Sequence, residues 1–144
     1  MLEKFTIVIP TFNNVNYLTL CIESILKNSS TTHQLIVHIN GLDQATEFFL
    51  NKKKILYTKT NSNVGLCSGV NLAANKAKTN YILYAHDDMY FLPNWDVKLD
   101  EEVRKINHNN FYLSMTHISY MDGVKGDLQH IKFDCGSNLD QFDE

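Results

Sequence analysis

The chain has 144 residues, of which 44% are hydrophobic, and a formal net charge of −3 at pH 7. That length suits one α/β domain with a single core, and the absence of a basic surplus excludes broad binding to nucleic-acid phosphates. A small molecule is therefore the expected partner. Cys21, Cys67 and Cys135 form no CxxC pair, which argues against a zinc site or disulfide framework and favours a reducing, cytoplasmic location. No apolar run approaches the roughly 20 residues of a membrane span.

The first part of the chain alternates strand-like and helix-like segments. Residues 5–10 form an apolar, β-branched run that should end as a strand at Pro10, because proline has no N–H for the ladder. Apolar residues recur at helical spacing over residues 17–26. A strand over residues 34–39 and a helix capped by Asp43 follow, and we expect that helix to run to Leu50.

The same alternation continues into the middle of the chain. A weaker strand over residues 55–59 precedes a segment rich in Asn and Gly, after which apolar positions between Leu66 and Ala77 predict another helix. Residues 81–85 form a fourth strand, and Pro93-Asn94 introduces a helix over about residues 95–106. Alternating strands and helices predict a mostly parallel sheet between helical layers.

Beyond these elements, residues 111–119 can form one more strand. In parallel sheets of this kind, ligands bind beyond the carboxyl ends of the strands. Those ends carry polar loops here: Thr11 to Asn14, Asn40-Gly41, and His86 to Met89. We therefore expect the binding site at this edge of the sheet.

The pair Asp87-Asp88 directly follows an apolar strand, where a carboxylate is costly unless its charge is compensated. Mg²⁺ or Mn²⁺ would compensate it, since these ions take one or two carboxylates and complete their shell with water and phosphates. The alternative is a turn or a helix cap. Likewise, His86 either joins the metal shell or hydrogen-bonds locally.

The segment Asn61–Asn71 (NSNVGLCSGVN) opens a helix, so its backbone can approach a phosphate or a sugar. It matches neither GxGxxG nor a P-loop. The alternative is a flexible loop ended by a helix start, with Gly69 allowing close packing of the helix on the sheet.

Together these segments resemble family-two glycosyltransferases of the GT-A fold. FTIVIPTFNN resembles the family's first strand and loop, and the segment from TNSNVGL to FLPNW resembles its central part, in the same order and spacing. The resemblance covers residues 4–105. It implies a three-layer α/β/α fold with a mostly parallel central sheet, and an enzyme that transfers a sugar from a nucleotide diphosphate sugar to an acceptor hydroxyl.

The resemblance also implies roles for individual residues. The loop of Pro10, Thr11, Phe12 and Asn13 would pack against the nucleotide base. The family's central asparagines and glycine match Asn63, Gly65 and Asn71, and its DxD-type motif matches His86-Asp87-Asp88. Asp87 would then accept from the ribose or act through water, while Asp88 would bind the Mn²⁺ or Mg²⁺ that joins the two phosphates, with His86 as a further candidate ligand.

The chain departs from the family pattern at two positions. An acidic pair commonly follows the family's second strand, where this chain has Ile39-Asn40-Gly41. The Asn40 amide can accept from a ring N–H and donate to a neighbouring carbonyl, a pattern that uracil and thymine present, so UDP- or TDP-sugars are favoured. Secondly, His86 replaces the first acidic residue of the DxD-like motif, which leaves metal binding mainly to Asp88.

We expect residues 1–144 to form a single GT-A-like domain, with residues 1–107 as the nucleotide-sugar-binding part and residues 108–144 as the start of the acceptor-side part. Family members generally continue into a half that supplies a catalytic carboxylate. The chain is therefore a trimmed protein, a fragment or a natural minimal relative, and the sequence leaves these open. Asp140 and Asp143 are candidates for the carboxylate, which is otherwise unassigned.

Two other functions stay open. A nucleotide-sugar-binding module that has lost transfer would need the same donor-side residues. A sugar nucleotidyltransferase is less favoured, because residues 10–16 contain none of the Gly, Lys or Arg of its usual loop.

Overall fold

The computed structural model describes residues 4–119, 130–136 and 138–142. The chain forms two compact units, Met1–Lys105 and Ile106–Glu144. The first unit holds every segment that the sequence marks for donor binding.

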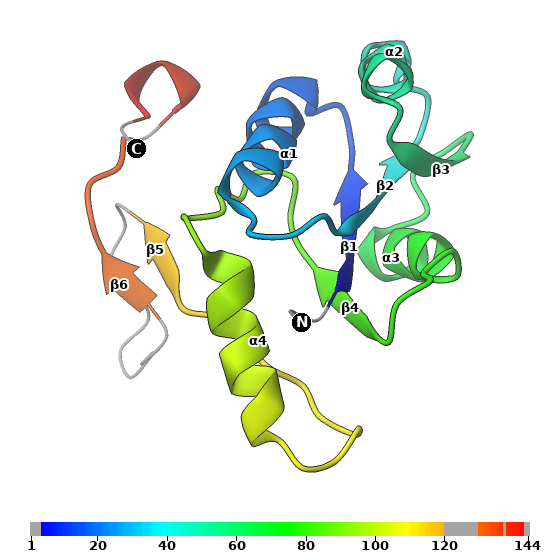
Figure 1. The fold of residues 1–144 in the computed structure, drawn as a ribbon. Coiled ribbons are helices and arrows are strands. Elements are labelled where there is room, and N and C mark those ends of the chain that lie inside the picture. The colour runs from blue at the N-terminus through cyan, green and yellow to red at the C-terminus, as the bar shows by residue number, and fades with distance from the viewer. Residues whose placement is uncertain (1–3, 120–129, 137, 143–144) are drawn as a thin grey trace. The chain divides into compact units, whose positions relative to one another are not determined.

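The first unit is built on a four-stranded parallel sheet (Figure 1). Its strands are β1 (Phe5–Thr11), β2 (Gln34–Asn40), β3 (Leu56–Thr60) and β4 (Tyr81–Tyr84), in the order β3-β2-β1-β4. Strand β1 pairs with β2 from Thr6–Gln34 to Thr11–Ile39 and with β4 from Phe5–Tyr81 to Val8–Tyr84. The predicted parallel sheet is confirmed, with each strand boundary within one residue of its expected place.

Four helices connect or follow the strands: α1 (Val15–Asn28), α2 (Gln44–Lys53), α3 (Leu66–Ala74) and α4 (Trp95–Lys105). The predicted cap of α2 is confirmed, since Asp43 accepts hydrogen bonds from the N–H and hydroxyl of Thr46. Helix α3 ends three residues before Ala77, where a short turn from Ala74 to Ala77 leads toward β4.

The core lies on both faces of β1, which is buried along its whole length. On one face, Val8 and Ile36 pack with Ala73 of α3. Side chains alternate between faces along a strand, so Ile7 and Ile9 point to the opposite face, where the buried side of α1 supplies Leu18 and Ile22. Figure 1 shows α1 and α3 on opposite sides of the sheet, which confirms the three-layer α/β/α arrangement.

The sequence predicts that β1 ends at Pro10, but the strand continues for one more residue, to Thr11. Pairing with β4 stops at Val8, whereas pairing with β2 continues through Pro10 opposite His38. The proline thus lies where β1 is paired on one side alone. There a missing N–H need not remove a ladder hydrogen bond.

The second unit contains β5 (His117–Ser119), β6 (His130–Lys132) and the short 3₁₀ helix η1 (Leu139–Gln141). Strands β5 and β6 pair in parallel. The predicted strand over residues 111–119 is wrong for its first six residues, which have no regular structure. Apolar side chains suit a strand only where a partner strand covers them, and Tyr112 here is 88% exposed.

None of the helices in the described ranges is long and apolar enough to cross a bilayer.

Candidate functional site

The carboxyl ends of β1 and β4 are joined by a hydrogen bond between side chains. Thr11, the last residue of β1 and 3% exposed, donates from Oγ1 to Asp87 Oδ2 at 2.6 Å. This distance lies at the short end of the range for O–H···O hydrogen bonds. The end of β1 and the turn after β4 are thus in direct contact, and Oδ2 of Asp87 already has a hydrogen-bond partner.

Asp87 and Asp88 form a turn directly after Ala85 and His86, so the turn that the sequence left open as an alternative is the local geometry of this pair. Asp88 is exposed and Asp87 is half-buried. Beneath them, the buried Cys21 thiol donates to the His86 carbonyl at 3.5 Å. Burial, together with the negative charges of Asp87 and Asp88, raises the pKa of Cys21 to about 12. Two carboxylates therefore place a negative field at this turn.

The segment after the acidic turn is fixed to α1 through the backbone of Phe91. Its N–H donates to Ser24 Oγ at 2.9 Å, and its carbonyl accepts from Asn28 Nδ2 at 2.6 Å. Neither Ser24 nor Asn28 is predicted to have this role from the sequence. Both lie on the apolar face of α1, where a polar residue needs a buried partner, and that is the signal that could have revealed them.

His86 is engaged by a neighbour rather than by the acidic pair. Its Nε2 lies 2.9 Å from the Tyr84 hydroxyl, and the two rings lie 5.0 Å apart. This favours the local hydrogen bond over metal ligation for His86.

The loop after β1 reaches the loop after β2. Phe12 is 53% exposed, and its ring lies so close to Gly41 that a Cβ there would stand 3.3 Å from Phe12 Cε2. Gly41 also has a φ of 130°, which non-glycine residues rarely adopt. Asn13 takes a left-handed φ of 52° as the chain turns into α1. Phe12 thus presents an exposed aromatic face at the carboxyl edge of the sheet.

The loop after β3 is held to the end of β2 by Asn40. Its Oδ1 accepts from the Val64 N–H at 2.7 Å, and its Nδ2 donates to the Gly65 carbonyl at 3.3 Å. Asn63 Oδ1 accepts from the Gly65 N–H at 2.8 Å. The proposed contact of Asn40 with a nucleotide base stays a prediction, while its contacts within the protein are with this loop.

Three other predicted residues take no part in the hydrogen bonds described above. Pro10 is buried in β1, and Asn71 is exposed in the second turn of α3. Asp140 is exposed in η1, where its N–H donates to Asn138 Oδ1 at 3.1 Å. Asp143 lies outside the described residues, so both candidates for the catalytic carboxylate stay predictions.

Gly69 confirms the expected close approach of α3 to the sheet. A Cβ at Gly69 would stand 2.7 Å from Cδ2 of His38, a fully buried residue of β2. His38 Nδ1 lies 2.8 Å from Thr58 Oγ1, and burial lowers the pKa of this histidine. The glycine therefore lets α3 lie against the sheet close to the site.

The donor set at the acidic turn fits a hard divalent cation. Asp88 offers an exposed carboxylate, and Asp87 retains Oδ1 beside the oxygen that binds Thr11. Across the described part of the chain, no three His, Cys, Asp or Glu side chains gather into a group that could hold an ion. One or two carboxylates suffice for Mg²⁺ or Mn²⁺ when a ligand's phosphates complete the shell.

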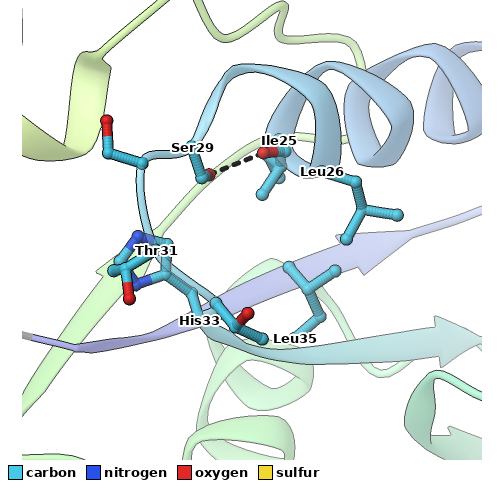
Figure 2. Close-up of a pocket in the computed structure, with 8 residues that line it drawn as sticks. Ile25, Leu26, Ser29, Thr31, His33 and Leu35 are labelled. Atoms are coloured by element: carbon cyan, nitrogen blue, oxygen red, sulfur yellow. Dashed lines mark hydrogen bonds between the residues drawn. The ribbon is translucent and has the colours of Figure 1, made fainter.

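A hollow of about 210 Å³ lies elsewhere, at the amino end of β2 (Figure 2). Its lining includes Ile25, Leu26, Ser29, Thr31, His33 and Leu35. The parallel strands place this hollow at the edge opposite the acidic turn. We propose the site at the carboxyl edge, because the linked polar loops lie there and the buried polar side chains beside the hollow, His33 and Asp96, already bind each other.

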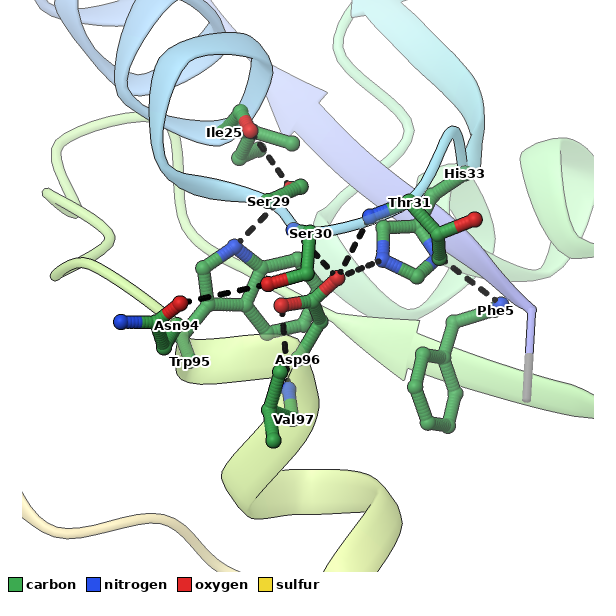
Figure 3. Close-up of polar contacts among 10 residues, drawn as sticks. All are labelled: Phe5, Ile25, Ser29, Ser30, Thr31, His33, Asn94, Trp95, Asp96 and Val97. Atoms are coloured by element: carbon green, nitrogen blue, oxygen red, sulfur yellow. Dashed lines mark hydrogen bonds and ion pairs between the residues drawn. The ribbon is translucent and has the colours of Figure 1, made fainter. Parts of the chain in front are cut away.

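Those polar groups centre on Asp96, which is 1% exposed (Figure 3). Its Oδ2 accepts from the N–H groups of Ser30 and Thr31 at 2.8 and 3.1 Å, and lies 3.1 Å from His33 Nε2. The Phe5 N–H donates to His33 Nδ1 at 3.2 Å, so the histidine proton is on Nε2, facing Asp96. Burial opposes ionisation of Asp96, but the hydrogen bonds from Ser30, His33 and Thr31 prevail and lower its pKa.

The parallel sheet with linked polar loops at its carboxyl edge defines a Rossmann-like α/β ligand-binding domain. The family model described as Glycosyl transferase family 2 matches residues 6–142. The chain therefore belongs to glycosyl transferase family 2, as its resemblance in sequence implies.

Curated relatives carry glycosyltransferase names. An uncharacterized glycosyltransferase of Rickettsia bellii (strain RML369-C) is 28% identical over 123 residues, which are 83% of this chain and 17% of that protein. Glycosyltransferase GlyA of Streptococcus pneumoniae serotype 4 (strain ATCC BAA-334 / TIGR4) is 29% identical over 91 residues, 60% of this chain and 13% of that protein. The chain thus spans less than a fifth of the length of these relatives.

Solved structures of TarS from S. aureus share the fold. TarS matches with a TM-score of 0.62 and 17% identity, over 78% of this chain and 24% of TarS. A structure of TarS 1-349 in complex with UDP gives the same score and identity, over 78% of this chain and 39% of that one. The likeness confirms the GT-A fold.

Proposed function

We propose that this chain is the donor-binding part of a glycosyltransferase, one that transfers a sugar from a nucleotide diphosphate sugar to an acceptor hydroxyl. The observation that carries the proposal is the hydrogen bond from Thr11 to Asp87, which joins the loop after β1 to the acidic turn after β4. It places the carboxylates beside the aromatic loop at the edge where α/β sheets bind ligands. The UDP named for the TarS structure supports a uridine nucleotide.

Each loop at the carboxyl edge would bind a different part of the nucleotide diphosphate sugar. The exposed Phe12 ring offers a stacking surface for the base, with Thr11, Asn13, Asn40 and Gly41 around it. Asp87 faces the ribose through its free oxygen. The loop of Asn63 and Gly65, followed by Asn71 in α3, lies toward the sugar and phosphates, where the helix N-terminus favours negative charge.

Asp88, with Asp87 as its neighbour, would hold Mn²⁺ or Mg²⁺. Such an ion neutralises the charge that develops on a departing diphosphate. The protein's own part is to hold both carboxylates toward the ligand. Thr11 does this for Asp87, while Ser24 and Asn28 fix the chain after the turn.

On the acceptor side, the family's mechanism needs a carboxylate that deprotonates the acceptor hydroxyl. Asp140 and Asp143 stay the candidates in this chain, although exposure of Asp140 means that further contacts would have to hold it in place. The separate cysteines of the sequence fit a cytoplasmic enzyme.

The test is metal-dependent binding of UDP, GDP, TDP and their sugars, measured by thermal shift with and without Mn²⁺. Ligand at a hundred times its Kd should add about 2.7 kcal/mol of apparent stability. Asp88→Asn keeps the size of the side chain but removes its charge, so the Mn²⁺-dependent part of the shift should largely vanish. Glu101→Gln, an exposed change in α4, is the matched control. Equal shifts for wild type and Asp88→Asn, with or without chelator, would refute the metal assignment.

The two alternative functions give different results in a turnover assay. A binding module without transfer would show the same metal-dependent binding but no acceptor-dependent release of nucleotide. A nucleotidyltransferase would release pyrophosphate from a nucleoside triphosphate and a sugar phosphate.

A further inference from the structure

The loop that enters α3 is exposed along its length. Every residue from Asn61 to Ser68 is exposed, so burial of apolar side chains does little to hold this segment in place. Its position has to come from hydrogen bonds. Some of these are local, such as Thr60 Oγ1 to the Ser62 carbonyl at 2.8 Å and the Gly65 N–H to Asn63 Oδ1 at 2.8 Å. Local bonds shape the loop but do not place it against the sheet.

Asn40 supplies the contact that does place the loop. It is the last residue of β2, is 6% exposed, and reaches Val64 and Gly65, which are 24 and 25 residues away in sequence. Its Oδ1 accepts a hydrogen bond from the Val64 N–H, and its Nδ2 donates one to the Gly65 carbonyl. The amide thus uses both of its ends on consecutive residues of one loop.

The second of these contacts extends to the helix. The Gly65 carbonyl that accepts from Asn40 also accepts from the Gly69 N–H at 3.2 Å, which is the first hydrogen bond of α3. Gly65 is the N-cap of α3, has a φ of 82°, and has open space where a Cβ would be. Asn40 therefore fixes the start of α3, with its unpaired N–H groups, against the end of β2.

We propose that Asn40 is a positioning residue of the donor site: it holds residues 64–65 and the α3 N-terminus in the place where they meet a nucleotide diphosphate. The inference rests on the proposed function. It differs from recognition of a base by Asn40, since the amide is nearly buried and both its ends bind the loop. Its loss should weaken binding through the diphosphate, equally for every base.

The experiment combines hydrogen exchange with binding. Exchange of the Val64 amide is followed by NMR, and the Kd values of UDP, TDP and GDP are measured with Mn²⁺ for wild type, Asn40→Ala and Asn40→Asp. Asn40→Ala should speed exchange at Val64 by about tenfold and weaken all three nucleotides by a common factor of about five to ten. Asn40→Asp keeps the acceptor but loses the donor, so Val64 should stay protected while all three nucleotides bind a few-fold more weakly. Asn51→Ala, which changes an exposed residue of α2, is the control and should change neither the Val64 exchange rate nor the nucleotide Kd values.

Several outcomes would overturn the proposal. For Asn40→Ala, unchanged Val64 exchange with a loss confined to UDP and TDP would show that Asn40 reads the base. Unchanged exchange with unchanged affinities in the same variant would show that Asn40 does not hold the loop. If Asn40→Ala does not fold, Asn40→Asp carries the test by its uniform loss. Failure of wild type to bind any of the nucleotides would instead refute the proposed function, while Val64 exchange would still decide whether Asn40 holds the loop.

Discussion

The hydrogen bond between Thr11 and Asp87 allows a quantitative test of the site that needs no ligand. Thr11→Val keeps the β-branched shape of a buried strand residue and removes only the hydroxyl that donates to Asp87 Oδ2. Hydrogen bonds to charged groups contribute about 1.5–3 kcal/mol to stability. Asp87 is half-buried, so water can replace part of the lost bond. We therefore expect a loss of about 1.5 kcal/mol for Thr11→Val, at the low end of that range.

A double-mutant cycle isolates the contact itself. Asp87→Asn removes the charge, and Thr11→Val should then cost less in the Asp87→Asn protein than in wild type, by about 1 kcal/mol. The four free energies of unfolding come from urea titration at pH 7. If the effects of Thr11→Val and Asp87→Asn add to within about 0.4 kcal/mol, the two side chains are not coupled. In that case the loops after β1 and β4 would be held together by something other than this bond.

The remaining predictions concern packing and pH. Gly69→Ala places a Cβ 2.7 Å from the His38 ring, and we expect the overpacking cost of about 1–3 kcal/mol to exceed the helix gain of up to about 1 kcal/mol. Thermal unfolding should therefore show a lower Tm for Gly69→Ala but not for the exposed control Ser68→Ala, and an unchanged or higher Tm would contradict the close approach of α3 to the sheet. Because the pKa of Asp96 is lower in the folded chain than its ordinary value of 3.8, its contribution to stability is present above that value and is lost as pH falls through the folded pKa. Urea midpoints measured from about pH 2 to about pH 6 should therefore fall more steeply with acid in wild type than in Asp96→Asn, and parallel profiles would argue against the network. The lowered pKa of His38 acts at higher pH: its contribution is complete above about pH 6.5 and declines below it, a decline that His38→Asn should remove.

Hydrophobic periodicity was sufficient for most of the first unit. The run FTIVIP is apolar on both faces because β1 is central and covered by helices on both sides, and parallel strands of that kind read as continuous apolar runs. The helical spacing from Leu18 to Ile25 likewise matched the buried face of α1, whereas Leu26, which the same pattern includes, is 56% exposed. Asp43 could be predicted as a cap because its role depends only on residues a few positions away.

Contacts between distant side chains could not be predicted in this way. Thr11 and Asp87 lie 76 residues apart, and His33 and Asp96 lie 63 apart. Periodicity shows which face of an element is buried, but it does not show which polar group meets which across two loops. For the same reason the hydrogen bonds of Asn40 to the loop after β3 could not be predicted, while its contact with a nucleotide base stays a prediction. The strand prediction was wrong over residues 111–116 for a different reason, since a strand needs a partner strand that the local sequence does not reveal.

The two polar clusters of the first unit lie at opposite edges of one sheet, and their different connections imply different effects of mutation. At the amino edge, Asp96 binds the backbone before β2 and, through His33, the first residue of β1. The side chains of His33 and Asp96 are buried and bound to each other, so changes there should lower stability. At the carboxyl edge, Thr11 binds the half-buried Asp87, and Asn40 binds a loop that is itself exposed. An exposed loop costs little to displace, so a change at Asn40 should affect ligand binding more than folding, whereas Thr11→Val should also lower stability. Helix α1 connects the two edges through Ser24, Asn28 and Ser29, which hold the chain between the acidic turn and Trp95. A stable amino edge thereby keeps Asp87 and Asp88 of the carboxyl edge in one place.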